Sequence, residues 1–216
     1  HPIEGSTREL GLVIPTDVTQ YTHTPGQVAF SSDGTQLLVT TKANASGNAV
    51  DAFGVARDGR LSDSPVVNAL PGTTPFAVTF DQTGHLVVAE AGPSALVTFT
   101  LNGDGTISQI NSLASGQPGL CWVAPAGAFF FTGNTASNST SGYESSATGQ
   151  LTLLGATATD LGTVDASATS DGSFLYVQTG TYGIVDEFQV NANGSLTAIG
   201  SVAVAGAAGG QGIVAL

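Results

Sequence analysis

Eight polar residues could do chemistry if the fold brings them to one place. A carboxylate or a neutral imidazole can act as a general base, and Glu90 and His23 are the candidates for this role. The ammonium of Lys42 could stabilise the oxyanion that forms when water attacks a carbonyl carbon. The candidates for substrate binding are Gln27, Asn134, Asp165, Gln178 and Tyr182. The alternative is that all eight are polar loop groups in contact with solvent.

Other kinds of reactive site find little support in the sequence. His1, His23 and His85 lack the spacing of metal ligands, and one cysteine, Cys121, forms neither an intrachain disulfide nor a multi-cysteine metal site. We expect Cys121 to pack in the core rather than to act as a nucleophile. NGDGTIS at 102–108 lacks the later glutamate of a calcium loop, and the chain has no G-x-S-x-G turn. The sequence therefore predicts no metal and no cofactor.

Charge and hydropathy exclude two modes of binding, one to nucleic acid and one across a membrane. Of the 216 residues, 16 are acidic and 4 are basic, so the formal net charge is −12. So few cations cannot form the basic stripe that binds nucleic acid, and no apolar run approaches the ~18 residues of a membrane span. The abundance of Gly, Ser, Thr and Asn together with low charge favours an extracytoplasmic β protein, the alternative being a cytoplasmic domain with an uncharged surface.

An internal repeat organises the chain. Glycines at 34, 84, 127 and 172 follow similar turn sequences, such as SSDGTQLLV and TSDGSFLYV. A second turn series, including RDGRLS and GDGTIS, has glycines at 59, 105, 149 and 194. Both series share a period of about 45 residues, which is the length of a four-stranded propeller blade.

Each repeat predicts four antiparallel strands. A short apolar strand leads into the first glycine turn, a strongly β-forming strand follows, and the third strand alternates apolar residues around Phe53, Phe99 or Phe188. In the third repeat TSGYESS stands where the third strand belongs, so the pattern weakens there. No amphipathic helical period occurs. We therefore expect an all-β propeller with blades at 25–70, 74–115, 117–160 and 163–206.

Blade geometry places the candidate residues. The starts of first strands and the ends of second strands meet at one rim of a propeller, so the eight polar residues are expected around one mouth of the central channel. A cluster of this kind would form a site for a small-molecule ligand.

The two ends of the chain predict an incomplete ring. Residues 1–15 resemble the last strand of a preceding blade, and residues 207–216 resemble a closing first strand. The chain then holds about 4.5 blades, and we expect it to be the C-terminal part of a seven-bladed ring of ~315 residues. Open blade edges would expose backbone and apolar surface. The expected partner is therefore the set of missing N-terminal blades, on the same protein or as a separate chain.

The repeats resemble a known family. GQVAFSSDGTQLLVTTKANASGNAVDAFGVARDGRLS, with YVQT at 176–179 and LVTT at 38–41, is similar to the lactonase-like seven-bladed propellers, which include 6-phosphogluconolactonase, carboxymuconate-lactonising enzyme and YVTN-repeat surface proteins. The resemblance implies a channel mouth with His, Arg and Glu and hydrolysis of a sugar lactone or a similar small molecule. Here Gly26 stands at the arginine position, Lys42 at one glutamate position, and Glu90 at a glutamate-like position in the next repeat.

Two functions from different classes follow. One is a lactone hydrolase, in which Glu90 or His23 activates water and Lys42 stabilises the oxyanion; it requires a carboxylate, a cation and a perturbed pKa at the mouth. The other is a non-catalytic secreted binding or scaffold propeller, whose mouth would be polar but uncharged.

Overall fold

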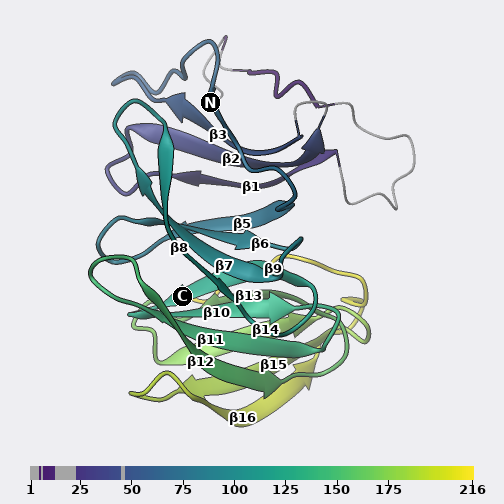
Figure 1. Ribbon diagram of the computed structural model, residues 1–216. Coiled ribbons are helices and arrows are strands. Elements are labelled where there is room, and N and C mark those ends of the chain that lie inside the picture. Colours follow the sequence, from purple (N-terminus) through teal and green to yellow (C-terminus); the bar gives the residue numbers. More distant parts are fainter. Residues whose placement is uncertain (1–4, 6, 13–22, 45–46) are drawn as a thin grey trace.

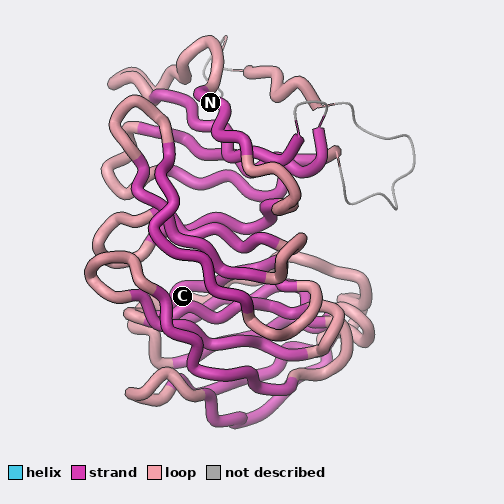
Figure 2. Tube along the Cα trace, in the orientation of Figure 1, coloured by secondary structure: helices cyan, strands magenta, loops and turns pink. Residues whose placement is uncertain are grey.

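The computed structural model describes residues 5, 7–12, 23–44 and 47–216, and these residues form strands, turns and loops without a helix (Figure 2). The strands are, in chain order, β1 (Thr24–Phe30), β2 (Gln36–Asn44), β3 (Gly47–Gly54), β4 (Val66–Ala69), β5 (Pro75–Phe80), β6 (Leu86–Glu90), β7 (Ala95–Leu101), β8 (Ile107–Ala114), β9 (Leu120–Ala126), β10 (Phe129–Asn134), β11 (Ser139–Ser145), β12 (Leu151–Ala158), β13 (Thr163–Ala168), β14 (Phe174–Thr179), β15 (Ile184–Val190) and β16 (Leu196–Ala203).

The strands form four antiparallel sheets of four strands each, and every sheet is a meander of consecutive strands. We call them blade 1 (β1–β4), blade 2 (β5–β8), blade 3 (β9–β12) and blade 4 (β13–β16). The blades are stacked face to face in chain order (Figure 1). The predicted all-β propeller of four-stranded antiparallel blades is thus confirmed. In the described part of the chain no helix has the length and apolarity that a membrane crossing would need.

The glycine turns join the strands as the repeat predicts. All eight repeat glycines have positive φ, between 63° and 90°. At the β1–β2 turn Gly34 has a φ of 71°, a conformation that glycine adopts without the steric penalty of a Cβ. The Asp33 carboxylate accepts hydrogen bonds from Ser31 Oγ at 2.7 Å and from the Thr35 N–H at 3.0 Å, which fixes this turn.

The third strand of blade 3 forms although its sequence is weakly apolar. TSGYES lies within β11, which pairs with β10 and β12 along its whole length. Tyr143 is fully buried at the place that phenylalanine takes in the other blades, and its hydroxyl donates to the Leu113 carbonyl at 3.4 Å. Backbone pairing on both sides and one buried aromatic ring are therefore enough to hold this strand.

The core consists of three apolar layers, one between each pair of neighbouring blades. Blades 1 and 2 share a cluster that includes Leu38 and Val88, blades 2 and 3 share one that includes Val87 and Phe130, and blades 3 and 4 share the third. Blades 2 and 3 thus bury both faces against their neighbours, whereas blades 1 and 4 each bury one face in these layers.

The two ends carry no strand in the described residues. Residues 7–12 have no strand, and the Arg8 guanidinium donates to the carbonyls of Leu61 and Ser62; the rest of the predicted strand at 1–15, apart from Gly5, lies outside the described residues. The segment 207–216 lies beside β13, and its Ala215 N–H donates to Ser167 Oγ at 3.0 Å. This is the side of β13 on which a further first strand would lie.

Candidate functional site

A cavity of about 490 Å³ lies where the first strands begin and the second strands end. Its wall combines all four blades with the C-terminal segment. The lining residues are Pro25, Gly26, Lys42, Phe76, Ala91, Gly119, Cys121, Trp122, Thr135, Val164 and Gln211. The volume falls within the range of about 300–1,000 Å³ that small-molecule sites occupy. The rim predicted to form the channel mouth therefore contains a cavity of ligand size.

Lys42 supplies the cation of this cavity. It lies near the end of β2, two residues before Asn44, and it is only 5% exposed. Its Nζ lies 3.8 Å from the centroid of the Phe76 ring on blade 2. Burial lowers the pKa of the ammonium, while the nearby Cys121 acts in the opposite direction. Within the described residues Lys42 forms no salt bridge. The ring face attracts the cation, and no described carboxylate neutralises it.

Cys121 and Trp122 stand side by side at the start of β9 and both line the cavity. The Cys121 Sγ lies 3.1 Å from Thr135 Oγ1. Burial raises the pKa of the thiol, an effect that the Thr135 hydroxyl and the Lys42 charge only partly offset. The thiol is therefore mostly protonated at neutral pH and is not prepared as a nucleophile, although it reaches the cavity instead of the core.

Glu90 ends β6 and lies directly before the cavity residue Ala91. It pairs with Pro75 in the register of the sheet, and its side chain is 5% exposed. Burial raises the pKa of the carboxyl group to about 7. A carboxyl group that titrates near neutral pH suits general-base chemistry, and Glu90 lies next to the wall without itself lining it.

Asp165 binds the protein's own backbone. Its carboxylate accepts hydrogen bonds from the Ala166 N–H at 2.7 Å, from the amides of Gly212 and Ile213, and from the Trp122 side chain. Burial raises its pKa in spite of these bonds. Asp165 therefore holds the C-terminal segment and Trp122 in place, so its predicted role in substrate binding stays a prediction with few acceptor positions left for a ligand.

The other candidates lie outside the cavity wall. Gln27 Oε1 accepts the Val78 N–H at 2.8 Å and so links β1 to β5. Asn134 is fully buried, its Nδ2 donates to Ser139 and Ser141, and its Oδ1 has no partner among the described residues.

The remaining three candidates differ in exposure. The buried Gln178 likewise has an Oε1 with no partner in the described part of the chain, and Tyr182 is 65% exposed. His23 has a φ of 61°, and its N–H donates to the Lys42 carbonyl at 2.6 Å. Of the eight predicted residues, the structure places only Lys42 in the cavity wall.

Sequence reasoning missed the aromatic part of the wall. Phe76 and Trp122 stand near the starts of first strands, the same positions that identified the polar candidates. The eight candidates named from the sequence are all polar. A search of all first-strand starts for large rings would have found both residues.

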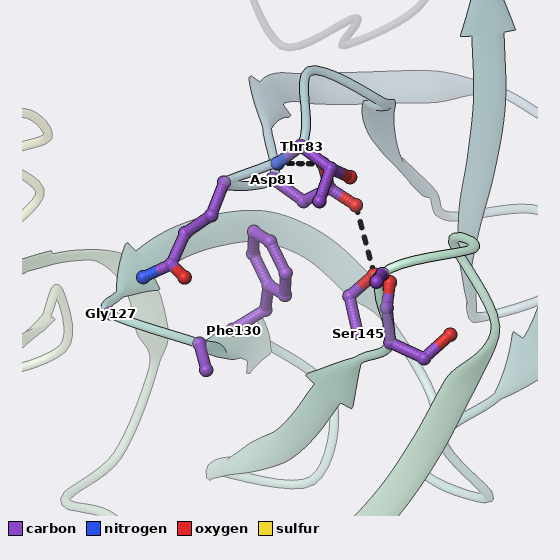
Figure 3. Close-up of a pocket in the computed structure, with 9 residues that line it drawn as sticks. Asp81, Thr83, Gly127, Phe130 and Ser145 are labelled. Carbon is purple, nitrogen blue, oxygen red and sulfur yellow. Dashed lines mark hydrogen bonds between the residues drawn. The ribbon is translucent and has the colours of Figure 1, made fainter.

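A smaller cavity of about 140 Å³ lies at the opposite rim, between blades 2 and 3 (Figure 3). Ser145 Oγ donates to Asp81 Oδ2 at 3.0 Å, and the same carboxylate oxygen lies 2.8 Å from His85 Nδ1. The three residue types are those of a hydrolytic triad, but the carboxylate rather than the imidazole stands in the middle. The serine therefore has no base, and the arrangement ties two blades together.

Possible metal ligands do not cluster in the described part of the chain. Among the residues with assigned positions, no group of three or more His, Cys, Asp or Glu side chains could hold a metal ion.

Comparison with known proteins shows the fold. No family model and no curated protein matches the chain. Among solved structures, a candidate 6-phosphogluconolactonase from Bacteroides fragilis has a TM-score of 0.73 at 18% identity, over 83% of this chain and 55% of that one. The periplasmic gluconolactonase PpgL of Pseudomonas aeruginosa gives 0.69 at 19% identity, over 83% and 54%. A protein of unknown function from Desulfotomaculum acetoxidans gives 0.72 at 20% identity, over 84% and 56%.

These likenesses establish that the chain has the fold of the lactonase-like propellers. The chain spans a little over half the length of the structures it matches.

Proposed function

We propose that the protein is a lactonase-like propeller that binds a small molecule at the channel mouth and hydrolyses a sugar lactone or a similar ring ester. The observation that carries this proposal is that a cation and a titrating carboxyl group stand at the same rim of the fold. Lys42 stands in the wall of the 490 Å³ cavity, and Glu90, with a pKa of about 7, lies one residue from that wall.

In the proposed reaction Glu90 acts as the general base. Its carboxylate removes a proton from water as the water oxygen attacks the lactone carbonyl, and the carbonyl electrons move onto the oxygen. The Lys42 ammonium stabilises this oxyanion. When the tetrahedral intermediate collapses, the ring C–O bond breaks and the proton passes from Glu90 to the departing alkoxide. The product is the open hydroxy acid, and Glu90 is again ionised.

The test is hydrolysis of a panel of five- and six-membered sugar lactones. We expect wild-type protein to hydrolyse at least one of them faster than buffer does, and Glu90→Gln to lower that rate by about 100-fold or more. The matched control is Glu144→Gln, which removes an exposed carboxylate and leaves the rate unchanged. A Glu90→Gln variant as active as wild type would overturn the role of Glu90.

A non-catalytic binding propeller is the second candidate. The observation in its favour is that Glu90 does not itself line the cavity, whose wall is largely apolar. Absence of hydrolysis across the panel, together with saturable binding of a small molecule that Lys42→Met weakens, would support this function over the hydrolase.

The partner we propose is a further set of blades of the same ring. Val28 and Phe30 of β1 are 57% and 59% exposed, and Val214 and Leu216 of the C-terminal segment are 77% and 99% exposed. Such apolar side chains on both open faces fit covering blades. Native mass spectrometry of the protein from its source should show about 100 residues beyond this chain, in one chain or two. A lone 21.5 kDa species would contradict this.

The proposed location is outside the cytoplasm. The support is the composition, since Gly, Ser, Thr and Asn are abundant while only 9% of the residues are charged. Fractionation of the native cells should find the protein in the extracytoplasmic fraction, and its recovery with cytoplasmic enzymes would contradict the proposal.

A further inference from the structure

Three residue types that occur once in the chain meet in one cavity. The sequence has one lysine, one cysteine and one tryptophan, and Lys42, Cys121 and Trp122 all line the 490 Å³ cavity. They come from blades 1 and 3, which are separated by blade 2. A chain that otherwise does without lysine keeps its one ammonium in this wall.

Removing this ammonium from water costs free energy unless a ligand offsets the loss. Lys42 is 5% exposed, so its charge is largely removed from water, and burial lowers its pKa. A buried charge needs a partner to offset desolvation. Within the described residues the Phe76 ring supplies a partial one at 3.8 Å, and the nearby thiol of Cys121 is mostly protonated. The wall therefore offers a cation with capacity for an anion.

The rest of the wall determines which uncharged part of a ligand fits the cavity. Phe76 and Trp122 present aromatic surface, while Pro25 and Val164 add aliphatic surface. Thr135 and Gln211 are the uncharged polar side chains of the lining. Rings bind well against aromatic side chains, so a ligand that carries a flat ring fits this wall.

We propose that the channel-mouth cavity binds an aromatic carboxylate, with the carboxylate on Lys42 and the ring against the aromatic wall of Phe76 and Trp122. The inference rests on the proposed function insofar as this cavity is the ligand site, and it names the class of ligand.

The experiment compares three probes by isothermal titration calorimetry on the purified protein. The probes are trans-cinnamate, its neutral analogue cinnamyl alcohol, and propionate, which has the charge without the ring. Trp122 fluorescence reports independently, because it is the chain's only tryptophan. We expect trans-cinnamate to bind at least about tenfold more tightly than either of the other two.

Variants of the cation separate charge from packing. Lys42→Met keeps a long side chain over Phe76 and should remove the preference for trans-cinnamate over cinnamyl alcohol. Lys42→Arg keeps the charge and should retain that preference, and circular dichroism should show both variants folded. The Arg60→Met control removes an exposed cation, so it should change nothing.

The results distinguish this inference from the proposed function. Equal affinity of the wild-type protein for trans-cinnamate and cinnamyl alcohol would overturn the assignment of an aromatic carboxylate as the ligand. An unchanged preference for trans-cinnamate in Lys42→Met would overturn it as well. In both cases the cavity would still be a ligand site. Tighter binding of a sugar lactone than of trans-cinnamate would do the same. If no probe and no lactone binds or changes Trp122 fluorescence, both the inference and the proposed function fail.

Discussion

The Val78 N–H donates a hydrogen bond of 2.8 Å to Gln27 Oε1, so a side chain of the first strand in blade 1 binds the backbone of the first strand in blade 2. A similar contact occurs at the open side of blade 4, where the Ala215 N–H of the C-terminal segment donates to Ser167 Oγ at 3.0 Å. β1 and β5 are thus linked through a side chain instead of through a continuous sheet.

Replacing Gln27 with Met should therefore destabilise the fold. Val78 is 1% exposed, so its N–H would lose its acceptor in a place that water hardly reaches. An unsatisfied buried donor costs about 1–3 kcal/mol. Urea unfolding should show a loss of this size for Gln27→Met and no change for Gln82→Met, which alters an exposed glutamine. Equal midpoints for the two variants would contradict the link.

The contact between Ser145 and Asp81 predicts acid sensitivity. Burial alone would raise the pKa of Asp81, but hydrogen bonds from Thr83, His85 and Ser145 outweigh it and lower the pKa below the ordinary aspartate value. The folded state thus holds this proton less tightly than the unfolded state does. The stabilisation is fully present above the unfolded pKa of ~4 and is lost as the pH falls through the lower folded pKa.

Urea unfolding of Asp81→Asn as a function of pH checks this. The variant should be less stable than wild type above pH ~4, and the difference should shrink below it. Glu144→Gln, which removes an exposed acid, should follow the wild-type curve. A constant difference between Asp81→Asn and wild type at every pH would show that the carboxylate charge has no part in joining blades 2 and 3.

The raised pKa of Glu90 predicts that its effect on folding stability depends on pH in the opposite direction. Its folded pKa of about 7 lies above the unfolded value of ~4.3, so the folded state binds the extra proton between these values. Stability should fall as the pH rises from ~4.3 to about 7 and then level off. Glu90→Gln should lack this slope and be more stable than wild type above pH 7 by a few kcal/mol, about 1.4 kcal/mol for each unit of the shift. Identical slopes would contradict a buried, titrating Glu90.

The sequence predicted the blades well because their determinants are local. The glycines at 34, 84, 127 and 172 mark turns that need positive φ, and the apolar periodicity between them defines the strands. β11 was harder to predict, since its pairing with two neighbouring strands replaces the apolar side chains that the other repeats have.

The site was less predictable because it depends on contacts between blades. That Lys42 would lie over Phe76 follows only from the stacking of β2 on blade 2, and that Asp165 would bind the amides of Gly212 and Ile213 follows from the path of the C-terminal segment. Neither relationship leaves a pattern in the spacing of residues. Strand position indicated the correct rim, but only the three-dimensional packing separates a cavity residue from one that links the blades.

Ligand that binds in the cavity at the starts of the first strands must cover the Cys121 thiol in its wall. The most direct measurement is the rate at which iodoacetamide alkylates Cys121, the chain's only cysteine, followed by intact-mass spectrometry with and without a saturating lactone or trans-cinnamate. We expect bound ligand to slow alkylation by about tenfold or more, because a filled cavity covers the thiol. An unchanged alkylation rate at a ligand concentration that saturates binding would place the ligand elsewhere and contradict binding in this cavity.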